Sequence, residues 1–136
     1  MDFMELRNVM IFSRQEETNI QIALSNYLKL KYPGVLFTIA PSGMKLSAFT
    51  AKMIKAMGYR AGSPDMMIFE PMFFLGKLYH GLFLEIKTEK GIISSNQKEF
   101  LELLDKRGYK TYVCFGYQAG IQAIENYLGV KQPAAP

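Results

Sequence analysis

The stretch that decides the fold is residues 82–88, with the sequence LFLEIKT. It is the most strand-like part of the chain, yet it contains two charges. Side chains two positions apart on a strand project from the same face, so Glu85 and Lys87 share one side, opposite the aliphatic residues. An exposed ion pair of little energetic worth is the ordinary explanation, and so short a pattern is weak evidence alone.

A second carboxylate, Asp65, opens the strand expected over 65–70. If this strand pairs antiparallel with residues 82–88, Asp65 approaches Glu85. Two such close carboxylates repel each other unless a cation neutralises them, and Mg²⁺ binds one or two carboxylates together with water and phosphate oxygens. The sequence therefore predicts a Mg²⁺ or Mn²⁺ site acting on a phosphodiester, with Lys87 orienting water or stabilising the transition state.

Capping residues, glycines and prolines divide the rest of the chain into alternating helices and strands. Ser13-x-x-Glu16 and Ser94-x-x-Gln97 resemble capping boxes that open helices. We expect a single α/β domain with a mixed central sheet flanked by helices in three layers, and a parallel last strand. The expected helices are 13–31, 47–58, 94–107 and 117–128, and the expected strands are 35–40, 65–70, 82–88 and 110–115, with a hairpin in 71–81.

Length and composition set the limits of this domain. The 136 residues suffice for one core, which we expect over 13–129 with a loose tail at 130–136. The apolar segment 1–12 is predicted either to contact a second subunit or to fold back onto its own core. The single cysteine excludes an internal disulfide, and no apolar run is long enough to span a membrane. A cytoplasmic protein without an organic cofactor is expected.

The distribution of charge favours a polyanionic partner. No acidic residue lies between Glu17 and Asp65, whereas this interval contains six lysines and arginines. A solvated basic face is the alternative explanation. We predict DNA phosphate contacts at Lys45, Lys52, Lys55, Arg60 and Lys90.

Motif order and spacing are similar to those of a VRR-NUC domain of the PD-(D/E)xK nuclease superfamily, over about residues 17–129. The resemblance implies a restriction-endonuclease-like core and a standalone protein of the kind found in bacteriophages and bacteria. It also implies a homodimeric, Mg²⁺- or Mn²⁺-dependent endonuclease that cuts branched DNA such as Holliday junctions. The motifs are Gly58, Gly62-Ser63-Pro64-Asp65, residues 81–87, residues 94–97 and Gly108-Tyr109.

The resemblance also implies roles for individual residues. Asp65 and Glu85 would bind the metal together with the backbone carbonyl of Ile86, and Lys87 would be the catalytic lysine. Glu17 would be a further acidic ligand on the first helix, with Gln21 one turn later on the same face.

Several of these roles have alternatives. Glu17 could instead complement the helix dipole, and Glu16 is an adjacent rival for its role. Gln97 matches a glutamine of the family's site, but it could merely complete the Ser94 capping box. Ser42 stands where relatives have asparagine, which makes a backbone contact to DNA at Ser42-Gly43 less secure.

Two other functions compete with that of a structure-selective nuclease. A non-catalytic accessory protein could keep the fold and bind nucleic acid, although the intact Asp65, Glu85 and Lys87 argue against it. A sequence-specific restriction-type enzyme would need an added recognition subdomain, for which 136 residues leave little room.

Overall fold

The computed structural model describes residues 2–41 and 44–129, and for residues 3 and 5–15 the backbone alone. The predicted tail at 130–136 and the Ser42-Gly43 turn lie outside the described residues. The elements in chain order are α1 (Phe3–Lys31), β1 (Phe37–Ile39), α2 (Ala48–Ala56), β2 (Met66–Ile68), β3 (Met72–Phe74), β4 (Lys77–Tyr79), β5 (Leu82–Lys87), α3 (Ser95–Lys106), β6 (Lys110–Phe115) and α4 (Tyr117–Leu128).

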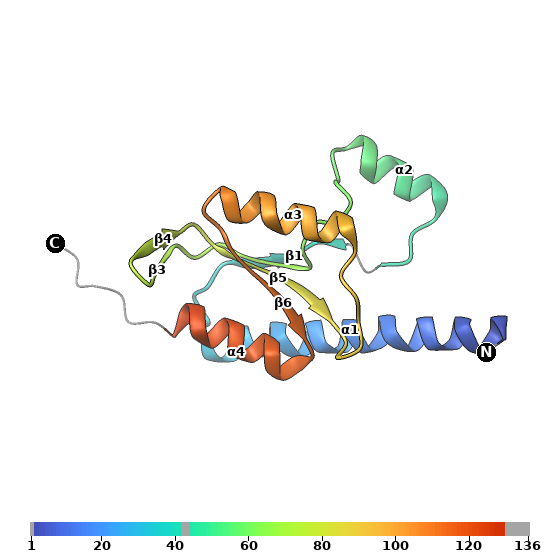
Figure 1. Ribbon diagram of the computed structural model, residues 1–136, viewed down its shortest axis with the longest axis horizontal. Helices are drawn as coiled ribbons and strands as arrows, with labels where there is room; N and C mark the ends of the chain where they lie inside the picture. The colour runs from blue at the N-terminus through green and yellow to red at the C-terminus, as the bar shows by residue number, and fades with distance from the viewer. Residues whose placement is uncertain (1, 42–43, 130–136) are drawn as a thin grey trace.

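A four-stranded mixed sheet forms the centre of the fold, in the order β1-β2-β5-β6. β2 is antiparallel to both β1 and β5, whereas β5 and β6 are parallel. α3 covers one face of the sheet, and α1 and α4 lie on the other (Figure 1). The predicted α/β class, the mixed sheet and the parallel last strand are confirmed.

β5 is a central strand, and both of its faces are buried. Leu82, Leu84 and Ile86 lie in the main core with residues of β2, α1 and α4. Phe83 and Glu85, on the opposite face, are buried as well. The alternation in the sequence therefore separates two packed faces of the strand rather than a buried face from a solvent-exposed one.

The first helix begins at Phe3, so the start predicted at Ser13 is wrong. No glycine or proline occurs before Pro33, so nothing in the sequence stops the helix from continuing through the capping-box pattern. The N-terminal half of α1 runs past the end of the sheet (Figure 1). A role for residues 1–12 in dimer contacts stays a prediction.

The C-terminal half of α1 is fixed to α4 by one carboxylate. Glu125 accepts hydrogen bonds from the hydroxyls of Tyr27 and Tyr32, and its Oε1 lies 2.6 Å from Nζ of Lys31. Gly120 of α4 allows close approach of the two helices, because a Cβ there would lie 2.6 Å from Cδ1 of Leu24. These contacts hold the C-terminal half of α1 against α4.

The aromatic connection between β2 and β5 is a hairpin, as predicted. β3 and β4 pair antiparallel in a separate two-stranded sheet. Leu75 and Gly76 both have positive φ, at 50° and 78°, as a type I′ hairpin turn requires. Nζ of Lys110 lies 5.2 Å from the ring centroid of Phe74 and 5.6 Å from that of Tyr79, which ties the hairpin to β6.

α2 differs from the other helices because none of its residues is buried. Its predicted cap is confirmed, since Oγ of Ser47 accepts a hydrogen bond from the backbone N of Thr50 at 3.1 Å. The helix ends before Gly58, whose φ is 116°. It stands away from the sheet, on the side where the N-terminal half of α1 projects (Figure 1).

Candidate active site

The start of β2 and the end of β5 bring the three predicted site residues together. Met66 pairs with Leu84, so the antiparallel register places Asp65 opposite Glu85. Oδ2 of Asp65 accepts a hydrogen bond from the backbone N of Ile86 at 2.7 Å. Nζ of Lys87 lies 3.9 Å from Oε1 of Glu85. Two carboxylates and one ammonium group thus share a small volume at one end of the two central strands of the sheet.

Glu85 is the most unusual group of the site, because it is a carboxyl with only 2% of its surface exposed. Its Oε1 accepts a hydrogen bond from Nε2 of Gln97 at 2.8 Å. Its Oε2 is buried without a hydrogen-bond partner among the residues that the structure describes. Burial raises the pKa of Glu85 to about 9, with further contributions from Asp65 and Glu17, while Lys87 lowers it. Without a cation, Glu85 is therefore protonated at neutral pH.

The chemistry of this site fits a hard divalent cation. A buried carboxyl oxygen without a partner, beside a second carboxylate, offers the oxygen ligands that Mg²⁺ and Mn²⁺ accept. Within the described part of the chain, no three His, Cys, Asp or Glu residues are close enough to form a complete cage. Mg²⁺ does not need one, because it usually keeps several waters and accepts phosphate oxygens.

The two predicted residues of α1, Gln21 and Glu17, each interact with a residue of the site. Gln21 donates a hydrogen bond from Nε2 to the backbone O of Asp65 at 3.4 Å, and the backbone N of Ala40 donates to the same oxygen at 3.0 Å. Gln21 therefore holds the backbone of Asp65. Glu17 is half-buried and its charge contributes to the raised pKa of Glu85, whereas Glu16 is exposed.

Gln97 makes both of the contacts that the sequence offered as alternatives. In the capping box of α3, its backbone N donates to Oγ of Ser94 at 3.2 Å, and its Oε1 accepts from the backbone N of Ser94 at 2.9 Å. Its Nε2 is then left to donate to Glu85. One side chain thus fixes the start of α3 and orients a carboxylate of the site.

These two contacts can be separated by mutation. Ser94→Ala removes only the cap, and we expect it to lower the free energy of unfolding by about 1 kcal/mol. Gln97→Ala also leaves Oε1 of Glu85 without its donor, so we expect an additional loss of about 1–3 kcal/mol at pH 5, where Glu85 of the folded protein is protonated. Urea denaturation measures both values. Equal losses in the two variants would show that the contact with Glu85 contributes nothing to stability.

The raised pKa of Glu85 makes the stability of the metal-free protein depend on pH. Between about pH 4.5 and 9 the folded protein keeps the Glu85 proton, whereas the unfolded chain loses it. Unfolding then releases a proton, so stability falls as the pH rises through this window. Glu85→Gln, which mimics the protonated form, is expected to be more stable than the wild type at pH 8 by at least about 1 kcal/mol.

Urea denaturation in EDTA at pH 5 and pH 8 tests this expectation. The difference in stability between Glu85→Gln and the wild type should shrink at pH 5, because Glu85 of the folded wild type is then protonated and as uncharged as glutamine. Glu102→Gln, at an exposed position of α3, is the matched control. Parallel pH profiles for the wild type and Glu85→Gln would contradict the assignment of the proton to Glu85.

Sequence reasoning did not identify two further features of the site. Tyr59 is half-buried, and burial together with the charges of Asp65 and Glu85 raises the pKa of its hydroxyl. Gly62 has a φ of 91°, and a Cβ there would lie 2.5 Å from the backbone O of Asn96, so only glycine lets this loop pass the start of α3. The glycine was visible in the motif, but no pattern in the sequence identified Tyr59.

The predicted DNA-binding residues are all exposed, and they come from several segments of the chain. Lys52 and Lys55 belong to α2, Lys45 precedes that helix, and Lys90 follows β5. Arg60 lies between α2 and β2. Its guanidinium is 3.7 Å from Oε1 of Glu99 and 5.5 Å from the ring centroid of Phe100, so Arg60 contacts α3.

Comparison with known proteins agrees with the fold described above. The VRR-NUC domain family matches residues 14–118. The chain is also similar to a solved structure described as a VRR_NUC domain protein, with 31% sequence identity and a TM-score of 0.66, over 86% of this chain and 91% of that chain. No curated protein matches the chain. Among the described residues, no helix is long and apolar enough to cross a membrane. The match spans most of the chain, including Asp65, Glu85 and Lys87, and the chain belongs to the VRR-NUC domain family.

Proposed function

We propose that this protein is a Mg²⁺- or Mn²⁺-dependent DNA endonuclease that hydrolyses phosphodiester bonds at Asp65, Glu85 and Lys87. The observation that carries the proposal is the buried, unpartnered Oε2 of Glu85, beside Asp65, in the part of the chain that the structure describes. A buried carboxyl beside a second carboxylate costs stability, and a bound cation would neutralise the two groups. Membership of a nuclease family supports the same conclusion.

The residues of the site have different proposed roles in binding the ion, stabilising charge and positioning the ligands. Asp65, Glu85 and the backbone carbonyl of Ile86 would hold the ion, which when bound would act as a Lewis acid and lower the pKa of a bound water. Glu17 would bind a second ion or a metal-bound water. Lys87 places a positive charge beside this site, where it favours the negative charge that develops on phosphate oxygens. Gln97 orients Glu85, and Gln21 holds the backbone of Asp65.

The preferred substrate that we propose is branched DNA, bound by a homodimer. Two copies related by a two-fold axis would present one site to each of two strands, as symmetric cutting at a four-way junction requires. The exposed basic residues around α2 and Lys90 suit phosphate contacts, which position DNA without reading its sequence. Residues 1–12, on the projecting half of α1, remain our proposed dimer contact.

A cleavage assay tests this proposal. End-labelled four-way junction, flap and linear duplex of matched sequence are incubated with the protein in Mg²⁺, Mn²⁺ or EDTA. We expect metal-dependent paired nicks close to the branch point of the junction. Cutting of the flap or duplex in preference to the junction would confirm nuclease activity, but it would show that branched DNA is not the preferred substrate. Tight binding without cutting would instead indicate a non-catalytic accessory protein.

A further inference from the structure

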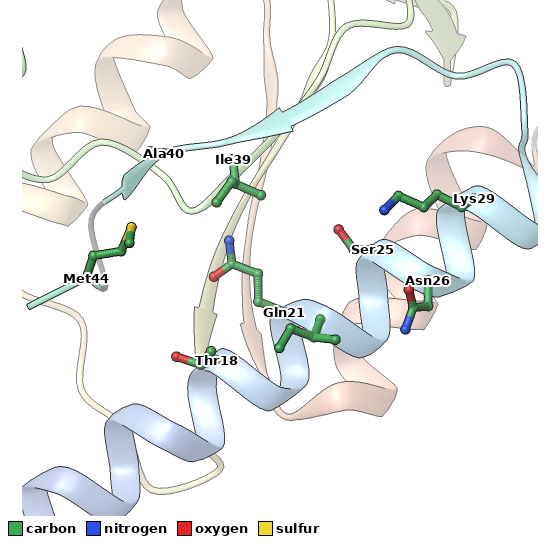
Figure 2. Close-up of a pocket in the computed structure, with 9 residues that line it drawn as sticks. Thr18, Gln21, Ser25, Asn26, Lys29, Ile39, Ala40 and Met44 are labelled. Atoms are coloured by element: carbon green, nitrogen blue, oxygen red, sulfur yellow. The ribbon is translucent and has the colours of Figure 1, made fainter.

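A groove of about 320 Å³ lies between α1 and β1 (Figure 2). Its wall on α1 consists of the polar residues Thr18, Gln21, Ser25 and Asn26, the cation Lys29 and the apolar Ile22. The facing wall comes from β1 and the residues after it, and includes Ile39 and Met44. β1 is the edge strand of the sheet, so the groove follows the outer margin of the fold.

The groove is linked to the active site through Gln21. This side chain lines the groove and also donates a hydrogen bond to the backbone O of Asp65 at 3.4 Å. Ala40, in the opposite wall, donates its backbone N–H to the same oxygen. Two lining residues of the groove therefore contact the backbone of Asp65, which carries a site carboxylate. A strand with its phosphate at the active site needs a path for the next nucleotide, and the groove offers one.

The α1 wall suits a sugar–phosphate chain. Thr18, Gln21, Ser25 and Lys29 follow the spacing of one helix face, and in Figure 2 the side chains of Gln21 and Ser25 point from α1 toward β1. None of the described residues that line the groove is acidic. From Gln21 to Lys29 the helix rises about 12 Å, at ~1.5 Å per residue. Amide and hydroxyl groups thus lead from the active site to a cation, which would attract a phosphate.

The β1 wall has the opposite character. Ile39 is 45% exposed and Met44 is 65% exposed, although both are large and apolar. An apolar surface facing a polar, cationic one suits a nucleotide, whose base is flat and weakly polar and whose phosphate is charged. A volume of about 320 Å³ is at the small end of ligand pockets, which suits a single mononucleotide-sized group.

We propose that the groove between α1 and β1 binds one unpaired nucleotide of the DNA strand that is being cut. Its base packs against Ile39 and Met44, and its phosphate lies at Lys29. The proposal rests on the proposed nuclease function and specifies its substrate. A base held in a duplex cannot enter so small a groove without leaving its partner, so cleavage is favoured where the neighbouring nucleotide is already unpaired. Branch points and frayed ends provide such nucleotides.

Binding is tested first, without metal and without cleavage. The isotope-labelled protein is titrated with the dinucleotide pTpT in EDTA, and amide shifts are followed by NMR. We expect the largest shifts at residues 21–29 and 39–40, and we expect Lys29→Glu to weaken binding about tenfold. Lys106→Glu, at the exposed far end of α3, makes the same change in net charge and should have less than a twofold effect. Equal weakening by both variants, or no shifts in the groove, would overturn the proposal.

Blocking the groove tests its role in cleavage. Ser25→Cys can be modified with a bulky maleimide, because the natural Cys114 is buried and burial raises the pKa of its thiol to about 12. Gln122→Cys on the exposed side of α4, modified in the same way, is the control. We expect the blocked groove to slow cutting next to an unpaired nucleotide at least tenfold, and cutting of a fully paired duplex less than twofold.

The outcomes separate this proposal from the nuclease function. If the blocked protein cuts both substrates normally, or loses activity equally on both, the groove does not bind an unpaired nucleotide. Nuclease activity would still be established by the unmodified protein. If the protein cuts no DNA but the dinucleotide shifts the amide signals of the groove, the nuclease function is contradicted. The groove would then still be a nucleotide-binding site.

Discussion

Replacing Lys87 with alanine is expected to lower the single-turnover rate of DNA cleavage by a factor of about 10³ or more. The Lys87 side chain is only 12% exposed, and its Nζ lies 3.9 Å from Oε1 of Glu85. A positive charge held in so sheltered a position acts more strongly on a developing phosphate charge than an exposed one. The same charge lowers the pKa of Glu85, so its loss also favours the protonated carboxyl, which binds a cation poorly.

The effect should be confined to the chemical step. DNA affinity, measured by fluorescence anisotropy in EDTA, is expected to change less than threefold, because the exposed basic residues remain. Lys90→Ala is the matched control, because Lys90 is exposed and lies three positions after Lys87 in the chain. We expect this substitution to reduce the cleavage rate only a few-fold. A Lys87→Ala variant that cuts at more than a tenth of the wild-type rate would show that Lys87 is not catalytic.

Asp65→Asn is expected to abolish cleavage and the response of the protein to metal together. Asparagine keeps the shape of the side chain, and its amide oxygen can still accept the hydrogen bond from the backbone N of Ile86. It lacks the negative charge that a hard cation requires. We therefore expect a folded variant that shows no cutting in Mg²⁺ or Mn²⁺.

Thermal unfolding provides a second readout for this variant. Mn²⁺ should raise the Tm of the wild type, because a ligand that binds only the folded state stabilises it, and it should leave the Tm of Asp65→Asn unchanged. Asp105→Asn, on the exposed surface of α3, removes the same charge away from the site and should behave as the wild type does. A normal Mn²⁺ response in Asp65→Asn would exclude Asp65 as a ligand.

The elements that could be predicted from sequence are those with clear local boundaries. β6 and α4 have the predicted limits, because glycines at 108, 116 and 129 interrupt the chain beside them. The start of α1 could not be predicted from its pattern. A capping box requires the preceding residue to leave the helix, and the residues before Ser13 are compatible with helix themselves.

In the active site, too, some features could be predicted from local sequence patterns and others could not. The proximity of Asp65 and Glu85 follows from a simple antiparallel pairing of two recognisable strands. The second contact of Gln97 required the position of α3 over the sheet, which no local pattern specifies. Tyr59 reaches the carboxylates from a loop after α2, and the groove depends on how α1 packs beside β1. These features arise from tertiary packing between segments that are distant in the sequence.

The most direct test of the account is the single-turnover cleavage of end-labelled DNA by the purified protein, with a titration of Mg²⁺ against an EDTA control. Asp65→Asn purified in parallel controls for contaminating nucleases. The account predicts strand breaks that require the metal, saturate with its concentration and are missing from the variant. Intact DNA at every metal concentration, with the protein folded and bound to it, would contradict the assignment of Asp65, Glu85 and Lys87 as a nuclease site.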